Sequence, residues 1–435
     1  MKICFHGAAE EVGRSCIVIN DSIMLDCGLK VGKHEQMEFH QFDSGSHYEN
    51  FGYPTTLKYN DIMFALISHA HLDHCGALPL FNKLGMNVPI FMTDTTKKIS
   101  EVLMNDALKI AKHDGHNFYS SENIQSVMRE IRNVNQSSNE KKIEHNYDNF
   151  KFEFFNSGHI PGSSSILLNI DGIKLLYSGD INYSETRLMK KAEKFPEADV
   201  LIIESTYGDK EHPKRDWEED KFLGNIDDTL KRGGSVLIPV FAVGRAQEIL
   251  LLLSKRNYEV PVYLDGMAKE ITSLVMNSKN PYVKNSDKLK KFMGDVIVVD
   301  RRSRETYMKH QGIFITTSGM CTGGPVMDYL HYLHNKSSHS IFLTGYQSED
   351  SNGHSILEHR TVILDNKRYD VRCQVEKFDF SAHSGKSDLI KMIKDVNPKV
   401  LILNHGNKKS MESLKNEFSG KIKVIVPKLG EEVVV

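Results

Sequence analysis

The stretch Ser68-His69-Ala70-His71-Leu72-Asp73-His74 places three imidazoles and one carboxylate directly after the apolar run 62–67. The apolar run predicts a buried strand, and in an extended chain residues i and i+2 point the same way. The first two histidines can therefore hold one metal ion from one side. Where the backbone then curls towards a helix, the aspartate and the last histidine can turn to a second ion.

The residue types in this stretch indicate which metal it would hold. Imidazole with carboxylate suits zinc, and iron or manganese less well, whereas magnesium and calcium prefer oxygen ligands. A single histidine after a strand is usually an ordinary core or surface residue. Three histidines and an aspartate in the order H-x-H-x-D-H predict a metal centre.

Two ions need more donors than this stretch offers, and three candidates lie far along the chain. His159, Asp180 and His405 each follow an apolar, strand-like run. Alone, each fits ordinary turn chemistry after a strand. Together with the H-x-H-x-D-H stretch they supply a further histidine for each ion and a carboxylate able to bridge the two.

Composition limits the class of protein. The chain has 435 residues, of which 40% are hydrophobic and 26% charged, which is typical of a globular protein of two or three domains. The formal net charge of −2 argues against broad, non-specific coating of DNA. No apolar run approaches the roughly 18 residues of a membrane span, and the N-terminus does not resemble a signal peptide.

The six cysteines contain no C-x-x-C pair, so we expect reduced, mostly buried thiols in a cytoplasmic protein. Cys75 follows the metal stretch directly, but packing is a more ordinary role than ligation for it. The basic runs 301–304 and 408–409 are interpreted as solvated surface.

The pattern of strands and helices changes twice along the chain. Alternating residues predict antiparallel hairpins in the first thirty residues, and the polar segment 28–60 predicts a surface loop region. Between about 208 and 375, strand-like runs each end in a Gly-bearing turn, which predicts βα units on a mostly parallel sheet. These runs are 235–241, 260–264, 312–317 and 340–344.

These motifs resemble those of the metallo-β-lactamase-fold hydrolases and, within them, the β-CASP nucleases. The chain is similar to the archaeal and bacterial relatives of the endonuclease of the cleavage and polyadenylation specificity factor, over essentially its whole length. The motifs that resemble those of the metallo-β-lactamase fold are Asp26 in Leu-Asp-Cys-Gly, the H-x-H-x-D-H stretch, His159, Asp180 and His405. The motifs that resemble those of the β-CASP nucleases are Glu204 in Glu-Ser-Thr-Tyr-Gly-Asp and His383 in Phe-Ser-Ala-His-Ser-Gly. The segments Ile238 to Glu248, Ser318 to Gly324 and Gly345-Tyr346-Gln347 also match.

The resemblance implies an α/β fold: a metallo-β-lactamase αββα sandwich with an inserted, mostly parallel β-CASP domain. The expected boundaries are 1–207 for the first part of the sandwich, 208–375 for the insert and 376–435 for the completing part. It also implies two Zn²⁺ ions, one held by His69, His71 and His159, the other by Asp73, His74 and His405, with Asp180 bridging. Asp26 would orient a ligand from outside the metal shell.

The catalytic residues implied by the resemblance are Asp73, His383 and Glu204. A hydroxide activated by two metals would attack phosphorus in line. His383 would help the leaving 3′ oxygen to gain a proton, and Glu204 would hold that imidazole in position.

Gly-rich turns in the inserted domain suit the phosphates of a polynucleotide, because they expose backbone N–H groups. The candidate substrate-binding residues are Arg245, Ser318, Gly319, Gly323 and Gly324. A cap of this kind would admit a single strand more readily than a duplex.

The late histidine, His405, favours RNA over DNA, because the DNA-repair members of the group lack it. We expect neither a KH-type N-terminal extension nor a C-terminal dimerisation extension, and we therefore expect an RNA-processing subunit or a second copy to aid recognition. Endonuclease and 5′→3′ exonuclease action both stay open. The alternatives are a small-molecule hydrolase of the same fold and a non-catalytic subunit of an RNA-processing complex.

Overall fold

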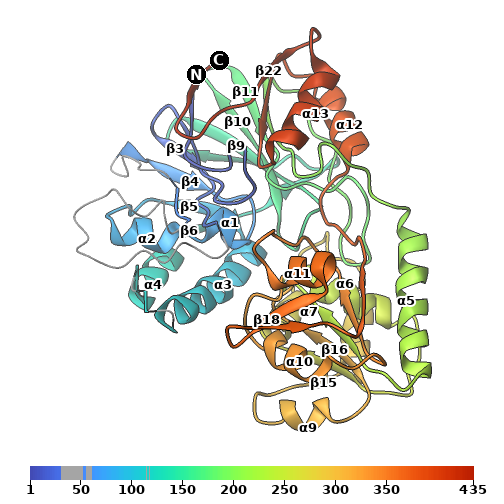
Figure 1. The fold of residues 1–435 in the computed structure, drawn as a ribbon. Coiled ribbons are helices and arrows are strands. Elements are labelled where there is room, and N and C mark those ends of the chain that lie inside the picture. The colour runs from blue at the N-terminus through green and yellow to red at the C-terminus, as the bar shows by residue number, and fades with distance from the viewer. Residues whose placement is uncertain (31–51, 55–60, 114, 117) are drawn as a thin grey trace. The chain divides into compact units, whose positions relative to one another are not determined.

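The computed structural model divides the chain into two compact units (Figure 1). The first unit consists of residues 1–185, 190–211 and 382–435, and the second of residues 186–189 and 212–381. The structure describes residues 1–30, 52–54, 61–113, 115–116 and 118–435. Most of the loop region expected at 28–60 lies outside the described residues. The boundaries expected after residues 207 and 375 stay predictions.

Two β-sheets form the middle of the first unit. The first, in spatial order, is β23 (Glu432–Val434), β1 (Lys2–Phe5), β2 (Ile17–Ile19), β3 (Ile23–Leu25), β4 (Phe64–Leu66), β5 (Ile90–Thr93) and β6 (Ile131–Val134). The second is β22 (Lys423–Ile425), β21 (Val400–Asn404), β12 (Val200–Glu204), β11 (Ile173–Tyr177), β10 (Ser164–Ile170), β9 (Phe150–Asn156) and β7 (Gln136–Ser137), and β8 (Glu144–Tyr147) also pairs with β9.

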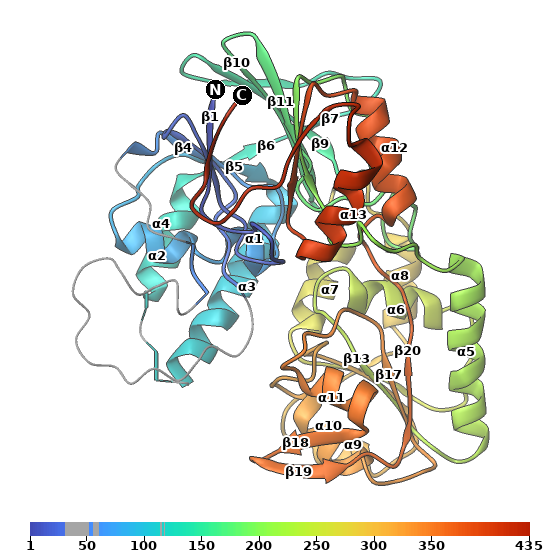
Figure 2. The same ribbon diagram turned by 45° about the horizontal axis from the view of Figure 1, so that its top comes forward.

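Helices cover the outer face of each sheet (Figures 1 and 2). Those of the first sheet are α1 (Leu72–Cys75), α2 (Leu78–Lys83), α3 (Asp94–His113) and α4 (Ser121–Glu130), and those of the second are α12 (Lys386–Val396) and α13 (Lys408–Phe418).

These layers form because successive side chains along each strand point to opposite faces of the sheet. In β2 the side chains of Ile17 and Ile19 join the core between the sheets, whereas Val18 faces the core under α1 to α4. In β21 Ile402 joins the central core, and Leu401 packs under α12 and α13. Side chains of a strand point alternately to its two faces, so each sheet buries both faces. The predicted αββα sandwich is confirmed.

The last residues of the chain complete the first sheet. β23 pairs antiparallel with β1, with Ile3 opposite Val433, and the terminal amine donates to the carbonyl of Val435 at 2.7 Å. The two chain ends therefore lie side by side (Figure 2). This pairing explains why a segment so late in the sequence belongs to the first unit.

The second unit is built on a sheet of six parallel strands. Their order is β15 (Ile297–Val298), β14 (Val262–Asp265), β16 (Ile313–Thr316), β13 (Val236–Pro239), β17 (Ser340–Leu343) and β20 (Gln374–Lys377), and a hairpin joins β18 (Thr361–Leu364) to β19 (Lys367–Asp370). The helices are α5 (Arg215–Lys231), α6 (Arg245–Leu253), α7 (Ala268–Met276), α8 (Ser286–Met293), α9 (Arg304–Met308), α10 (Val326–Leu333) and α11 (Asn352–His359). The predicted parallel α/β insert is confirmed.

Within the described residues, no helix has both the length and the apolar character that a membrane crossing requires.

Candidate metal centre

The fold brings the predicted ligands to one edge of the sandwich. β11, β12 and β21 are parallel neighbours, and β9 runs in the same direction because β10 is antiparallel to both β9 and β11. Carboxyl ends of such strands meet at the same edge. Asp180, Glu204 and His405 therefore stand side by side where β11, β12 and β21 end, and His159 follows β9.

The H-x-H-x-D-H stretch comes from the other sheet in the same way. His69 and His71 lie between β4 and α1, and Asp73 and His74 belong to α1. The backbone of α1 lies so close to residue 28 that only glycine fits there. A Cβ on Gly28 would lie 1.8 Å from the carbonyl oxygen of Asp73. A larger residue at position 28 would push this turn out of place.

One group of donors consists of three imidazoles and one carboxylate oxygen. Nδ1 of His71 lies 3.2 Å from Nε2 of His69 and 3.2 Å from Nε2 of His159. Oδ2 of Asp180 lies 3.5 Å from the same two Nε2 atoms. All four atoms lie within 4.8 Å of one another, as the ligands of a single ion would.

A second group forms around the other oxygen of the same aspartate. Oδ1 of Asp180 lies 3.4 Å from Nε2 of His74 and 3.3 Å from Nδ1 of His405. Oδ2 of Asp73 lies 3.4 Å from Nε2 of His405. Asp180 thus presents one oxygen to each group, which is the arrangement of a bridging carboxylate.

Unpaired buried atoms indicate that these residues fit a metal. Nε2 of His74, Nε2 of His405 and Oδ1 of Asp180 are buried without a hydrogen-bond partner. Leaving such atoms unpaired is costly, and each of them points into the cluster. Imidazole nitrogen and carboxylate oxygen are the donor set of zinc sites. All seven predicted ligands lie in this cluster, and their role as ligands stays a prediction.

Asp26 fixes the ring of His74 from behind. Its Oδ2 lies 2.7 Å from Nδ1 of His74 and also accepts hydrogen bonds from the hydroxyls of Ser68, at 2.7 Å, and Tyr177, at 2.6 Å. Its Oδ1 accepts from the backbone N–H of Ser68 at 2.7 Å. When Nδ1 of His74 donates to this carboxylate, the lone pair of Nε2 faces the cluster.

The other rings are held by similar contacts. Nδ1 of His69 lies 3.0 Å from the Ser68 hydroxyl, and Nδ1 of His159 lies 2.8 Å from the carbonyl oxygen of Ala382. In both rings Nδ1 can donate a hydrogen bond away from the cluster, which leaves Nε2 as an acceptor that faces the cluster. Ser68, Tyr177 and Ala382 were not predicted, because a serine, a strand tyrosine and a backbone carbonyl carry no sequence signal of such a role.

Glu204 and His383 form a pair beside the first group. Oε1 of Glu204 lies 2.9 Å from Nδ1 of His383 and accepts from the backbone N–H of Ile181 at 2.9 Å. Nε2 of His383 lies 4.0 Å from Oδ2 of Asp180. The Glu204 side chain is 1% exposed and that of His383 is 21% exposed, so a buried carboxylate holds a ring that solvent can reach.

The pKa shifts of His69, His71 and His159 differ in direction from that of His383. Burial lowers the pKa of His71 to about 4 and those of His69 and His159 well below their ordinary value, so these rings are neutral at pH 7, which is the form that can bind a metal. Burial also opposes charge on His383, but the carboxylates of Glu204 and Asp180 outweigh it and raise its pKa to about 9. His383 can therefore carry a proton at neutral pH.

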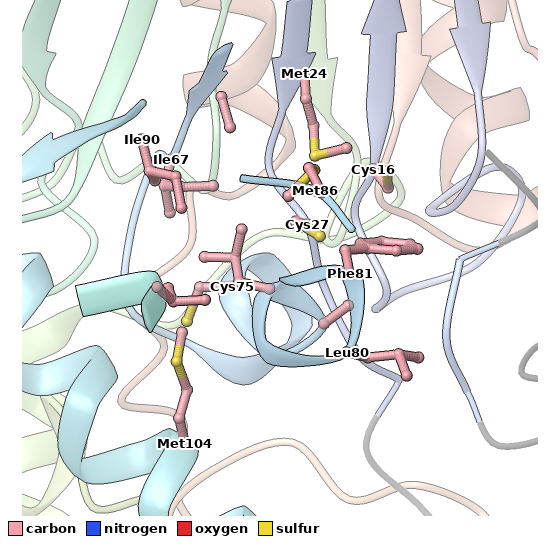
Figure 3. Close-up of a cluster of buried hydrophobic side chains, with 14 of the residues drawn as sticks. Cys16, Met24, Cys27, Ile67, Cys75, Leu80, Phe81, Met86, Ile90 and Met104 are labelled. Atoms are coloured by element: carbon pink, nitrogen blue, oxygen red, sulfur yellow. The ribbon is translucent and has the colours of Figure 1, made fainter. Parts of the chain in front are cut away.

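Cys75 takes no part in the cluster. Its thiol donates to the carbonyl oxygen of Ala70 at 3.2 Å, and the Ser100 hydroxyl lies 3.5 Å from its sulfur. Figure 3 shows it among apolar side chains together with Cys16 and Cys27. All six cysteines are free and buried, in agreement with the packing role expected for Cys75.

The predicted substrate-binding residues lie in the second unit. The turn before α6 bonds internally: the N–H of Gly244 donates to Oε1 of Gln247, at 2.8 Å, and that of Arg245 to the carbonyl of Val243, at 2.9 Å. A role for Arg245 therefore depends on its guanidinium. Ser318, Gly319, Gly323 and Gly324 lie in the loop between β16 and α10, and their contact with substrate stays a prediction.

The basic run 301–304 contains a structural arginine. Nε of Arg304 lies 2.6 Å from Oδ2 of Asp265, a carboxylate that also accepts from the Tyr329 hydroxyl at 3.0 Å. Arg301 and Arg302 are exposed. Only these two arginines of the run are presented to solvent.

Replacing Asp26 by asparagine is expected to weaken zinc binding about 10- to 100-fold, because the carboxylate that orients His74 loses its charge. Titration against a competing chelator measures the change. Tyr177→Phe removes a single bond to the same carboxylate and should have a smaller effect. Equal zinc affinity in Asp26→Asn and the wild type would contradict the orienting role.

Three family models match the chain. The metallo-beta-lactamase superfamily domain matches residues 20–203, and the Beta-Casp domain matches residues 246–356. The Zn-dependent metallo-hydrolase RNA specificity domain matches residues 368–427. These segments follow one another along most of the sequence.

Similar proteins come from archaea and animals. The chain is 40% identical to the probable RNase MJ4 of Methanocaldococcus jannaschii over 100% of both chains. It is 33% identical to RNase aCSPSF2 of Saccharolobus solfataricus, over 98% of this chain and 84% of that one. It is 31% identical to Integrator complex subunit 11 of Danio rerio, over 99% of this chain and 73% of the relative.

A solved structure shares the fold. A protein of unknown function from Enterococcus faecalis V583 aligns over 100% of this chain and 99% of its own, with a TM-score of 0.61 and 16% sequence identity. At this identity the likeness concerns the fold alone. The domain matches and the full-length relatives carry the assignment: this chain belongs to the β-CASP family of metallo-β-lactamase-fold hydrolases.

Proposed function

We propose that this chain is a zinc-dependent ribonuclease that hydrolyses phosphodiester bonds of single-stranded RNA, in RNA processing or decay. The observation that carries the proposal is one carboxylate, Asp180, shared by two donor groups beside the Glu204–His383 pair. The match of residues 368–427 to an RNA specificity domain, and relatives named as RNases, support RNA as the substrate.

Each residue has a defined task in this proposal. His69, His71 and His159 would hold one ion, Asp73, His74 and His405 the other, and Asp180 both. When bound, two divalent ions activate water at neutral pH and stabilise charge on phosphoryl oxygens.

His383 is the proton donor in this proposal. Its Nδ1 is engaged by Glu204, so a proton on Nε2 is available to the leaving 3′ oxygen. Glu204 acts through this ring as a positioning residue. The side chain of Asp73 is 25% exposed. In this proposal, substrate therefore reaches the second donor group from the side of Asp73.

Two other functions fit the chain less well. A lactonase- or thioesterase-type hydrolase of this fold would need neither the Glu204–His383 pair nor an intervening unit. A non-catalytic subunit would be expected to have lost ligands, and all seven predicted donors are present in the cluster.

Incubation of the purified protein with 5′-labelled single-stranded RNA tests the proposal. We expect cleavage with zinc, its loss on chelation and its return when zinc is restored. Internal cuts would indicate an endonuclease, and mononucleotides released from the 5′ end an exonuclease. The same RNA annealed into a duplex is the control and should be cut more slowly. A zinc-loaded protein that cuts no single-stranded RNA would refute the proposal.

The remaining expectations belong to the same proposal. We infer two zinc ions, a sandwich of residues 1–207 and 376–435, and an insert of residues 208–375. The free, buried cysteines support a reducing compartment, which we propose is the cytoplasm. A second copy of the chain or other RNA-processing subunits are the proposed protein partners.

A further inference from the structure

The loop between β1 and β2 has an unusual backbone. Ala8 and Glu10 have φ of 57° and 56°, and Ala9 between them is not in the left-handed region. Further along, Gly13 and Arg14 also have positive φ. Non-glycine residues rarely adopt this conformation. When left-handed and right-handed backbone conformations alternate along the chain, consecutive N–H groups point to one side. They then form a concave site for anions.

The N–H groups of this loop are not used by the protein. None of the residues that the structure describes accepts a hydrogen bond from the backbone N–H of residues 7–14. Ala8 is 0% exposed and Ala9 is 7% exposed, and Gly7 and Gly13 are also buried. Glu10 is exposed and residues 11, 12 and 14 are half-buried, so an acceptor from outside the protein can reach this loop. Because backbone N–H groups in folded proteins are nearly always paired, the unpaired ones of this loop are available to such an acceptor.

Both ends of the loop are attached to the second donor group. The carbonyl of Ala8 accepts from the backbone N–H of His405 at 2.8 Å. At the other end, the N–H of Ser15 donates to the carbonyl of Asp73 at 2.7 Å. The loop therefore borders the place where the phosphate of a substrate would be attacked.

The shape of the loop is fixed by close packing. A Cβ on Gly7 would lie 1.7 Å from the carbonyl oxygen of Arg14, so the loop closes on itself at a position that only glycine allows. The Glu11 carboxylate accepts from Nε of Arg14 and, at 2.7 Å, from Nζ of Lys30. These two cations neutralise Glu11. The other acid of the loop, Glu10, is exposed to solvent, where its charge is screened.

We propose that residues 7–14 form an anion-binding loop whose backbone N–H groups hold non-bridging phosphate oxygens of the RNA beside Asp73 and His405. The inference rests on the ribonuclease function proposed above and adds a binding element to it. A backbone site of this kind reads the phosphate and not the base, so it suits cleavage with little sequence preference.

A direct test observes one amide. Ala8-Ala9 is the only Ala-Ala pair in the sequence, so labelling alanine with ¹⁵N and with ¹³C at the carbonyl makes the Ala9 amide unique in a carbonyl-correlated spectrum. Titration of the zinc-loaded protein with inorganic phosphate should shift this signal in a saturable way, while the amides of Ala107 and Ala111 in α3 stay in place. An Ala9 signal that phosphate does not move would overturn the proposal, whether or not the protein cuts RNA.

A pair of variants tests the loop in catalysis. Glu10→Val puts a β-branched residue on an exposed left-handed position of the loop, and Asp171→Val does the same in the β10–β11 turn, where φ is 53°. We expect kcat/KM for RNA to fall roughly tenfold or more in Glu10→Val, as loss of a hydrogen bond to a charged group would cause. The substitution also removes a negative charge, which by itself would favour an anion, so a fall reports on the backbone of the loop. Asp171→Val should cleave RNA like the wild type, and both variants should keep their zinc.

The outcomes separate the two proposals. If the wild type cuts RNA and Glu10→Val cuts it as fast as Asp171→Val, the anion-binding loop is refuted and the ribonuclease stands. If the wild type cuts no RNA, the ribonuclease proposal fails, and the Ala9 titration still decides whether the loop binds phosphate.

Discussion

Replacement of His383 by alanine is expected to slow RNA cleavage about 10²- to 10⁴-fold while bound zinc stays unchanged. The side chain of His383 is 21% exposed, and this residue is not one of the seven ligands proposed for the two ions. Its loss removes the proton donor and leaves the His69, His71 and His159 group intact. Single-turnover cleavage of labelled RNA, with zinc analysis of the same sample, measures both quantities.

The chain offers a closely matched control for this substitution. His212 in the second unit pairs with Asp379, Nδ1 to Oδ2 at 2.8 Å, and its side chain is 22% exposed. His212→Ala removes an equally exposed imidazole from a carboxylate and should cleave RNA at the wild-type rate. Glu204→Gln keeps an acceptor for the ring without its charge, so we expect a loss smaller than that of His383→Ala. Wild-type turnover in His383→Ala would reject the proton-donor role.

The part of the site that could be predicted consists of residues whose type alone carries chemistry. Histidines and carboxylates after apolar runs were recognisable because parallel strands deliver their carboxyl ends to one edge. The structure places His159, Asp180 and His405 at that edge, at the ends of β9, β11 and β21. Spacing inside the H-x-H-x-D-H stretch was informative because the stretch spans the change from strand to helix.

The contacts that orient the ligands could not be predicted. Tyr177 follows two buried leucines in β11 and is itself buried, so the sequence presents it as a core residue. Only the packing of two sheets brings its hydroxyl to Asp26. The carbonyl of Ala382 comes from the chain 223 residues beyond His159. Such contacts depend on register between distant strands, which a local pattern does not encode.

Short strands without a clear pattern were also missed. The segment 120–142 is highly polar, and α4 occupies its first part. The strands β6 and β7 that follow it read Ile-Arg-Asn-Val and Gln-Ser, with few apolar residues. They form because the sheets offer edges to pair with: β6 joins β5, and β7 joins β9. Tertiary pairing overrides weak local preference here.

Replacement of Asp180 by alanine is expected to have the largest effect of all, because it removes an oxygen from each donor group at once. Oδ2 belongs to the group of His69 and His159, and Oδ1 to the group of His74 and His405. Losing several kcal/mol of charge stabilisation implies a drop in cleavage on the order of 10³-fold or more. Zinc content should fall as well, which distinguishes this variant from His383→Ala.

Zinc-dependent stability gives a readout that needs no RNA. A ligand that binds only the folded protein at 100 times its Kd raises the free energy of unfolding by about 2.7 kcal/mol. We expect zinc to raise the Tm of the wild type and to raise that of Asp180→Ala much less. Asp209→Asn is the control: this carboxylate is 9% exposed and accepts from the Ser410 hydroxyl at 2.9 Å, outside the cluster. If zinc stabilised Asp180→Ala as much as Asp209→Asn, the two groups would not share a bridging ligand, and the paired centre would have to be assigned differently.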